Sequence, residues 1–135
     1  MIKRGVVAGS LLLAAGCLTG PTPSPLLVSS NSTRYVLGAP IELLATNVSD
    51  RPLFVYSCMF PEEFEGGEWQ DDPHFMCNST AHFIRLSPGA TDTTAMTWVG
   101  LLLGPGTYRI PVSYSTDSSF ANSRGSVSNR FAVVQ

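Results

Sequence analysis

The feature that most limits the possible folds is a period-two alternation of apolar and polar residues in several short runs. In the clearest run, Tyr108, Ile110, Val112 and Tyr114 alternate with polar residues and a proline. Successive side chains of a strand point to opposite faces, so this spacing predicts a strand with one buried face. Pro111 has no amide donor, which predicts a sheet edge or a bulge at that position.

Similar runs recur along the chain, separated by turns rich in Pro, Gly and Asn. Ile41, Leu43 and Ala45 share one predicted face, and Thr94 and Trp98 share another with the methionine between them. Further strands are predicted at residues 34–37, 53–57, 82–86, 91–99 and 131–134, the first of them opening the domain. About seven short strands with such turns predict an all-β fold, an antiparallel β-sandwich.

The N-terminus predicts export. Lys3 and Arg4 precede an apolar stretch at residues 5–16, which is shorter than the roughly 20 residues of a membrane-spanning helix and is typical of a secretory signal. Cys17 follows Ala-Ala-Gly, which resembles the lipobox of bacterial lipoproteins, although alanine replaces the commoner leucine three residues earlier. The resemblance implies removal of residues 1–16 and acylation of Cys17. The alternative is an ordinary signal peptide with an incidental cysteine.

These features predict three parts: a signal peptide at 1–16, a lipidated N-terminus with a proline-rich tether at 17–30, and one sandwich domain at 31–135. The protein is then lipid-anchored at the cell envelope, on the periplasmic or extracellular face of a membrane. Loss of Lys3 and Arg4 leaves six arginines against ten carboxylates, a net charge of −4. An acidic chain without a basic patch is a poor candidate for nucleic-acid binding.

Several turn and core residues follow in an order that resembles a known family: Gly38, Asn47, Trp69, Leu86–Gly89, Trp98 and Gly104–Tyr108. The pattern is similar to the immunoglobulin-like β-sandwich of the bacterial intracellular proteinase inhibitor family, over residues 33–134. The resemblance implies the fold, and no inhibitory loop motif carries over. Tyr108, two residues after Gly106, suits a tyrosine corner, in which a buried ring sends its hydroxyl back to the backbone.

With Cys17 acylated, Cys58 and Cys77 remain for a disulfide in an oxidising compartment. The intervening residues 59–76 hold six of the ten carboxylates. We expect an acidic loop that burial alone cannot hold folded. Closing a loop of this length with a disulfide contributes roughly 3 kcal/mol in the chain-entropy model.

This loop is the predicted binding surface, and its candidate residues are Phe64, Glu68, Trp69, Asp71 and Asp72. The simpler interpretation of the two aromatic residues is that they fold inward and cover one end of the sandwich. In the alternative they form an exposed platform, rimmed by carboxylates, for a sugar or a cationic peptide. The polar segment 115–128 is a second candidate contact.

We considered two metal sites, for calcium and for zinc, in and around the acidic loop. The loop carboxylates could bind calcium, but their spacing does not match an EF-hand, and solvated surface charge explains them more simply. His74, Cys77, His82 and Cys58 are zinc-ligand types at an irregular spacing, and a disulfide accounts for the cysteines. We expect no metal and no cofactor.

Catalytic patterns are weak. Glu62 and Glu68 could act as an acid–base pair, but they lie in the predicted loop without partners, and no serine stands in a nucleophile elbow. We therefore expect that the protein is not an enzyme. The sequence favours a non-catalytic binding or assembly module at the cell envelope, with membrane lipid at Cys17 and an envelope protein or glycan as partners. A protease inhibitor is the alternative, and a small hydrolase is third.

Overall fold

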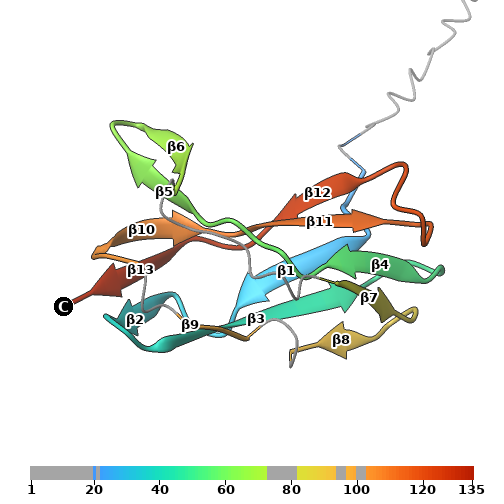
Figure 1. Cartoon of the computed structure of the whole chain (residues 1–135), viewed down its shortest axis with the longest axis horizontal. Helices are drawn as coiled ribbons and strands as arrows, with labels where there is room; N and C mark the ends of the chain where they lie inside the picture. Colours follow the sequence, from blue (N-terminus) through green and yellow to red (C-terminus); the bar gives the residue numbers. More distant parts are fainter. Residues whose placement is uncertain (1–19, 21, 73–81, 94–96, 100–102) are drawn as a thin grey trace, which may run out of the picture.

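The computed structural model describes residues 20, 22–72, 82–93, 97–99 and 103–135. These residues contain no helix, and strands β1 to β13 form three sheets (Figure 1). All strand pairs are antiparallel except β2 with β13. The predicted all-β sandwich is confirmed. Among the residues described, no helix is present that could cross a membrane.

The first sheet is built around β3 (Pro40–Asn47). β1 (Leu26–Ser30) pairs along one side of β3, and β8 (Thr91–Asp92) and β9 (Thr97–Val99) pair along the other. The predicted inward face of the central strand is confirmed, because Ile41, Leu43 and Ala45 are fully buried. The predicted single strand at residues 91–99 is wrong, since it is two short strands whose connection, 94–96, lies outside the described residues.

The domain begins earlier than the sequence predicts. Leu26 and Val28, which lie on β1 in the predicted tether, are both buried in the core. The Leu26 carbonyl also accepts a hydrogen bond from Ser126 Oγ at 2.8 Å, which links β1 to the other side of the sandwich. The predicted domain boundary at residue 30 is therefore wrong, because the sandwich already includes β1.

The second sheet has the order β2-β13-β10-β5-β6. Its strands are β2 (Arg34–Val36), β13 (Phe131–Val134), β10 (Gly106–Arg109), β5 (Glu62–Glu65) and β6 (Glu68–Asp71). β5 and β6 continue the sheet beyond β10 and rise above the body of the sandwich in Figure 1. This sheet therefore carries the acidic segment that the sequence analysis predicts as a loop.

The third sheet has the order β12-β11-β4-β7, with β12 (Arg124–Val127), β11 (Pro111–Ser115), β4 (Leu53–Tyr56) and β7 (Phe83–Leu86). The chain passes from the second sheet to the third at Ile110. The Ile110 amide donates to Ser128 Oγ at 2.9 Å, and the Ser128 amide donates to the Ile110 carbonyl at 3.0 Å. The run predicted as one strand is thus two strands, with Pro111 at the break as its missing amide donor predicts.

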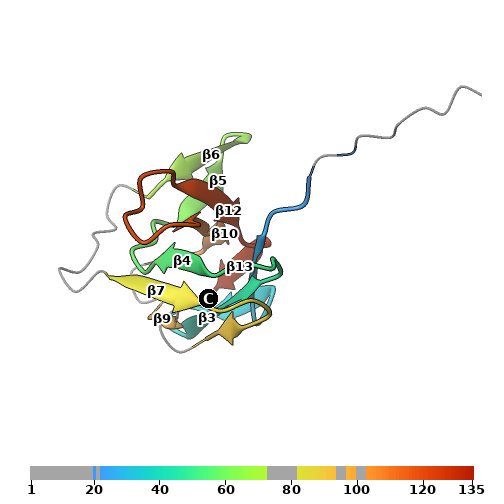
Figure 2. The same ribbon diagram turned by 90° about the vertical axis from the view of Figure 1, so that its right-hand side faces the viewer.

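One hydrophobic core contains residues of all three sheets, whose strands are seen along the long axis in Figure 2. Its aromatic centre is Phe131, whose ring lies edge-on to Tyr35 at 5.4 Å and stacks on Tyr108 at 6.2 Å between centroids. The strands are more numerous than the predicted seven because β1, β12 and the β5–β6 pair are additional and because two predicted runs are divided.

The tyrosine corner predicted at Tyr108 is present. Tyr108 is buried, and its hydroxyl donates to the Gly104 carbonyl at 3.0 Å. A Cβ atom at Gly106 would lie 3.1 Å from Tyr108 Cε2 and against the flexible end of the Glu63 side chain, so a larger residue would have to displace both side chains. Burial, and then the negative charge of Glu63, raise the pKa of Tyr108 to about 12.

Replacing Tyr108 with phenylalanine is expected to lower the free energy of unfolding by about 1 kcal/mol, because one neutral hydrogen bond is lost while the ring still packs. Urea unfolding measures the loss. The raised pKa adds a pH test. Stability from the neutral hydroxyl is complete below about pH 10 and falls as pH rises towards 12. A wild type and a variant with identical pH profiles between 9 and 11 would contradict this role.

Candidate functional site

The candidate site is the β5–β6 hairpin, where the sequence analysis predicts an irregular loop. Gly66 and Gly67 form its two-residue turn with φ values of 61° and 87°. Positive φ at both turn positions is the type I′ geometry that matches the twist of a hairpin, and glycine adopts it without strain. The predicted loop conformation is therefore wrong for residues 62–71, and pairing with β10 holds the hairpin.

One face of the hairpin combines aromatic rings with arginines. Phe64 and Trp69 are directly opposed on the two strands, with ring centroids 5.1 Å apart. The guanidinium carbon of Arg109 lies 4.4 Å from the centroid of the Trp69 ring, and that of Arg130 lies 5.4 Å from the Phe64 centroid. Such cation–π contacts contribute about 0.5–1 kcal/mol each at exposed sites.

This arrangement decides between the two interpretations of the aromatic residues. Phe64 is 38% exposed, and Trp69 is half-buried beneath arginine side chains. Neither ring belongs to the core. The inward interpretation is therefore wrong for Phe64, and the pair forms a partly covered surface instead.

An ion pair fixes the base of the hairpin. Arg109 Nε donates to a carboxylate oxygen of Glu62, and the two residues are also paired in register between β10 and β5. Glu62 and Asp71 lie opposite each other, two residues from the rings, and so share their face. Arg109 thus bridges the ring of Trp69 and the carboxylate of Glu62.

The tip of the hairpin holds an uncompensated pair of like charges. Glu65 and Glu68 are directly opposed, and both are exposed. Among the residues that the structure describes, neither has an ion-pair partner. Like charges facing each other across a sheet are destabilising. The hairpin therefore keeps two carboxylates at its tip at a cost to its own stability.

Two shallow hollows lie beside the base of the hairpin. One, of about 280 Å³, is lined by Cys58, Phe60, Glu62, Asp71, Pro111 and Ser113. The other, of about 250 Å³, is lined by Glu62, Arg109, Pro111, Gly125, Ser126 and Val127. Glu62 lines both, so the ion pair lies between them. Asp72, just beyond β6, is half-buried, and its amide donates to the Pro61 carbonyl at 3.1 Å.

Of the three cysteines, Cys58 is among the residues that the structure describes. Cys58 is buried and disulfide-bonded. Cys17 and Cys77 lie outside the described residues, as does His74, so acylation and the Cys58–Cys77 pairing stay predictions. Where side chains are described, no three His, Cys, Asp or Glu residues converge as metal ligands.

The sequence analysis did not identify Arg109 and Arg130 as site residues. Arg109 is the outward neighbour of Tyr108 and Ile110, but its contacts depend on β5, which was not predicted. The signal for β5 was present, because two glycines between residues of strand type indicate a two-residue hairpin. Nothing in the sequence places Arg130, 21 positions further along the chain, on the same rings.

Comparisons with known proteins give no family. No family model matches the chain, and no curated protein matches it. Similar solved structures include a mutant β-glucosidase from Listeria innocua in complex with laminaribiose (14% identity, TM-score 0.41). They also include the human CEP192 ASH/PapD-like domain (14%, 0.38) and a family 123 glycoside hydrolase from Clostridium perfringens (12%, 0.32).

The extent of these matches differs. The alignments cover 82%, 91% and 83% of this chain but 16%, 94% and 28% of the respective structures. The chain thus spans less than a fifth of the glucosidase. Such low similarity gives no information on activity or partners.

Proposed function

We propose that the protein is a lipid-anchored, non-catalytic binding module of the bacterial cell envelope, and that the β5–β6 hairpin contacts a basic partner protein. The observation that carries the proposal is the pair of opposed, unneutralised carboxylates at the hairpin tip, Glu65 and Glu68. Cationic groups of a partner would remove their mutual repulsion. Binding would then gain free energy that the isolated domain lacks.

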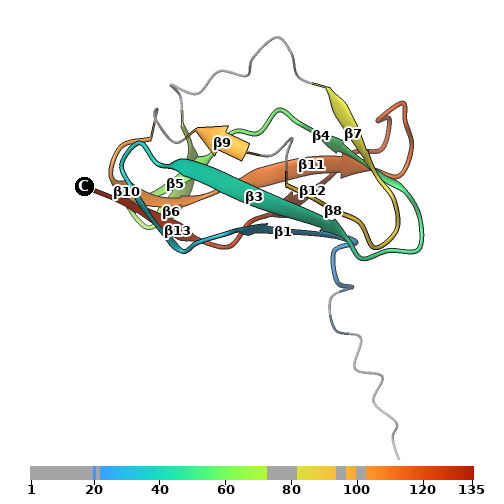
Figure 3. The same ribbon diagram turned by 90° about the horizontal axis from the view of Figure 1, so that it is seen from below.

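The position of the hairpin supports this role. The tether enters the domain at Pro25, whose carbonyl accepts a hydrogen bond from the Val48 amide at 2.9 Å, just before β1 begins. In Figures 1 and 3 this entry and the hairpin lie toward opposite ends of the long axis. An anchor at Cys17 would therefore hold the hairpin away from the membrane.

The aromatic face supports a rigid hairpin. Arg109 and Arg130 lie over its rings, and Glu62 pairs with Arg109 at its base. An element held in this way loses little conformational entropy on binding. The two hollows beside Glu62 add concave surface next to the same partner.

Site-specific photo-crosslinking in intact cells tests the contact. A crosslinker at Gln70, which is exposed on β6 and leaves both tip carboxylates in place, is expected to capture a protein, whereas one at Asp50, an exposed carboxylate on the β3–β4 turn, is not. The double variant E65Q/E68Q should lose the adduct formed by a crosslinker at position 64. Its stability should be equal to or up to about 1 kcal/mol above that of the wild type, because the repulsion is removed.

Two outcomes would overturn the proposal: equal capture at Gln70 and Asp50, or an adduct unchanged by E65Q/E68Q. Stoichiometric inhibition of an envelope or extracellular protease would instead favour the inhibitor alternative. The anchor is tested separately by intact mass and fractionation. A membrane-bound chain beginning at acylated Cys17 is expected, and C17S should release it. A mature protein that retains Met1 would refute the anchor alone.

A further inference from the structure

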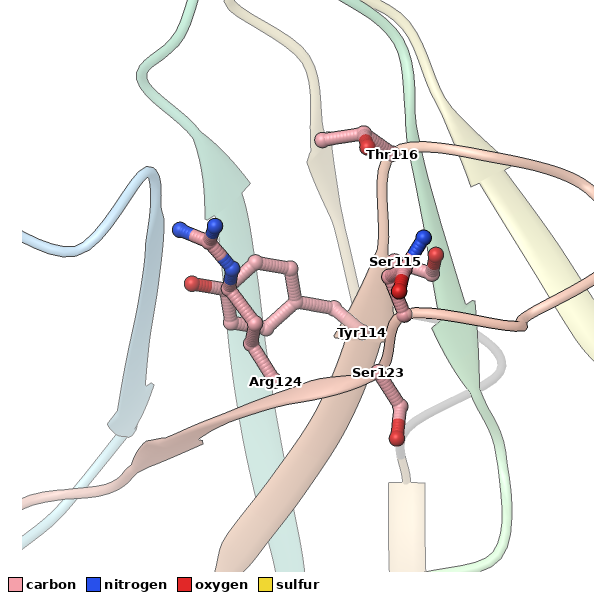
Figure 4. Close-up of a pocket in the computed structure, with 6 residues that line it drawn as sticks. Tyr114, Ser115, Thr116, Ser123 and Arg124 are labelled. Carbon is pink, nitrogen blue, oxygen red and sulfur yellow. The ribbon is translucent and has the colours of Figure 1, made fainter.

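A second concave site lies toward the other end of the domain, between the end of β11 and the start of β12 (Figure 4). It is a cavity of about 410 Å³, larger than either hollow at the hairpin, and within the range of small-molecule sites. Its lining residues are Tyr114, Ser115, Thr116, Asn122, Ser123 and Arg124. The β11–β12 loop and the hairpin lie far apart in Figures 1 and 3, so this site is separate from the proposed partner surface.

The lining has a defined chemistry. It offers the hydroxyls of Thr116 and Ser123, the amide of Asn122, and one guanidinium, with no carboxylate, whereas the buried Ser115 hydroxyl is already bonded within the loop. In Figure 4, Arg124 and Tyr114 lie on one side, and Ser115, Thr116 and Ser123 on the other. Arg124 is exposed and has no ion-pair partner in the described part of the chain. Arg124 is thus the one charged group among the lining residues, and the other groups around it can form hydrogen bonds.

Asp117 organises the loop from within. Its carboxylate accepts hydrogen bonds from Ser115 Oγ at 3.2 Å and from the Ser119 amide at 2.9 Å, and its own amide donates to Ser115 Oγ at 3.2 Å. The hydrogen bonds, above all that from the Ser119 hydroxyl, lower the pKa of Asp117. This carboxylate is bonded within the loop and is not among the lining groups.

Phe120 anchors the loop from outside. Its ring centroid lies 4.7 Å from that of Phe83 and 6.1 Å from that of Tyr56, on strands β7 and β4. Its φ of 59° is rare for a bulky residue, so packing and the hydrogen bond from its amide to the Asp117 carbonyl must hold it there. With both anchors the cavity is preformed, and a ligand need not order it.

We propose that this cavity binds an acidic sugar, with the carboxylate of the ligand on Arg124 and its hydroxyls on the serine, threonine and asparagine side chains. Arginine binds a carboxylate through two parallel N–H donors, which fixes orientation as well as charge. A ring with several hydroxyls matches the polar remainder of the lining. An apolar ligand would leave those groups unpaired, at a cost in affinity.

Calorimetry with the full chain tests the proposal, using glucuronate, glucose, inorganic phosphate and a polymer of glucuronate as probes. Glucuronate is expected to bind at least 10-fold more tightly than glucose or phosphate. R124Q should reduce its affinity at least 10-fold, and R124K should retain part of it as a point charge. R51Q, at an exposed arginine elsewhere, is the matched control and should bind normally.

The polymer of glucuronate distinguishes two kinds of ligand that carry the same groups, a polysaccharide and a free sugar acid. Tighter binding per site by the polymer than by the monomer indicates a polysaccharide, and the reverse indicates a free sugar acid. No binding of glucuronate at millimolar concentration, equal binding of glucose or phosphate, or an unaffected R124Q variant would overturn the proposal. Circular dichroism and thermal melting of R124Q exclude unfolding as the cause of lost affinity.

Discussion

Replacing Asn47 with alanine is expected to lower the free energy of unfolding by about 3–5 kcal/mol. The Asn47 side chain is fully buried at the end of β3, and both of its polar atoms are used. Nδ2 donates to the carbonyls of Arg51 (2.7 Å) and Leu86 (3.0 Å), and Oδ1 accepts from the amide and hydroxyl of Ser49. Alanine would leave these groups unpaired, and each buried one costs about 1–3 kcal/mol. Urea unfolding with unchanged m-value measures the loss.

Ser49 supplies the matched control for this prediction. Its hydroxyl donates to Asn47 Oδ1 at 2.7 Å and lies 3.0 Å from the Arg51 carbonyl, but it is nearer the surface. S49A should therefore cost only about 1 kcal/mol, because water can replace the lost contacts. Equal losses for N47A and S49A would show that the turn, and not the buried amide, stabilises this end of the domain.

Asn47 also illustrates what the sequence can indicate. Its place after an apolar strand and before a turn identifies it as a structural residue, because asparagine commonly bonds its own turn backbone. Its bond to Leu86 spans 39 residues and joins β3 to β7, two strands of different sheets. Its hydrogen bonds within the turn could be predicted from the sequence. Its bond to Leu86 could not, because that bond depends on how the two sheets pack.

The same distinction explains the error at β1. Residues 26–30 follow a proline-rich stretch and contain only two apolar positions that turn inward, Leu26 and Val28. Local composition therefore favours a tether. The strand forms because β3 supplies a register partner for every residue from Leu26 to Ser30, and because Leu26 fills the core. Tertiary contacts override composition here.

Some features of the candidate hairpin follow from local sequence, and others depend on tertiary contacts. Its acidic character and the two rings, Phe64 and Trp69, could be predicted from the sequence, and its turn could have been predicted from the glycine pair. Its orientation could not, because the aromatic face is set by Arg109 and Arg130 on two other strands or their approaches. A charged segment that looks unable to bury itself is held by neighbours distant in sequence.

Replacing Phe131 with alanine is expected to lower the free energy of unfolding by about 3–5 kcal/mol, the usual range for an aromatic residue lost from a core. Phe131 is 2% exposed and packs between Tyr35 and Tyr108. Its strand, β13, lies between β2 and β10, so the cavity would open where three strands meet. Thermal unfolding should show a melting temperature lower by about 10–20 °C.

Phe83 allows the same substitution at the surface. It is 48% exposed and contacts Tyr56 and Phe120 on the outer side of the third sheet. F83A should cost no more than about 1 kcal/mol, since it removes aromatic contacts without opening a core cavity. It should also loosen the loop that Phe120 anchors, so glucuronate affinity would fall in F83A but not in a variant such as F131L. Comparable destabilisation by F131A and F83A would mean that the second sheet does not depend on its aromatic centre.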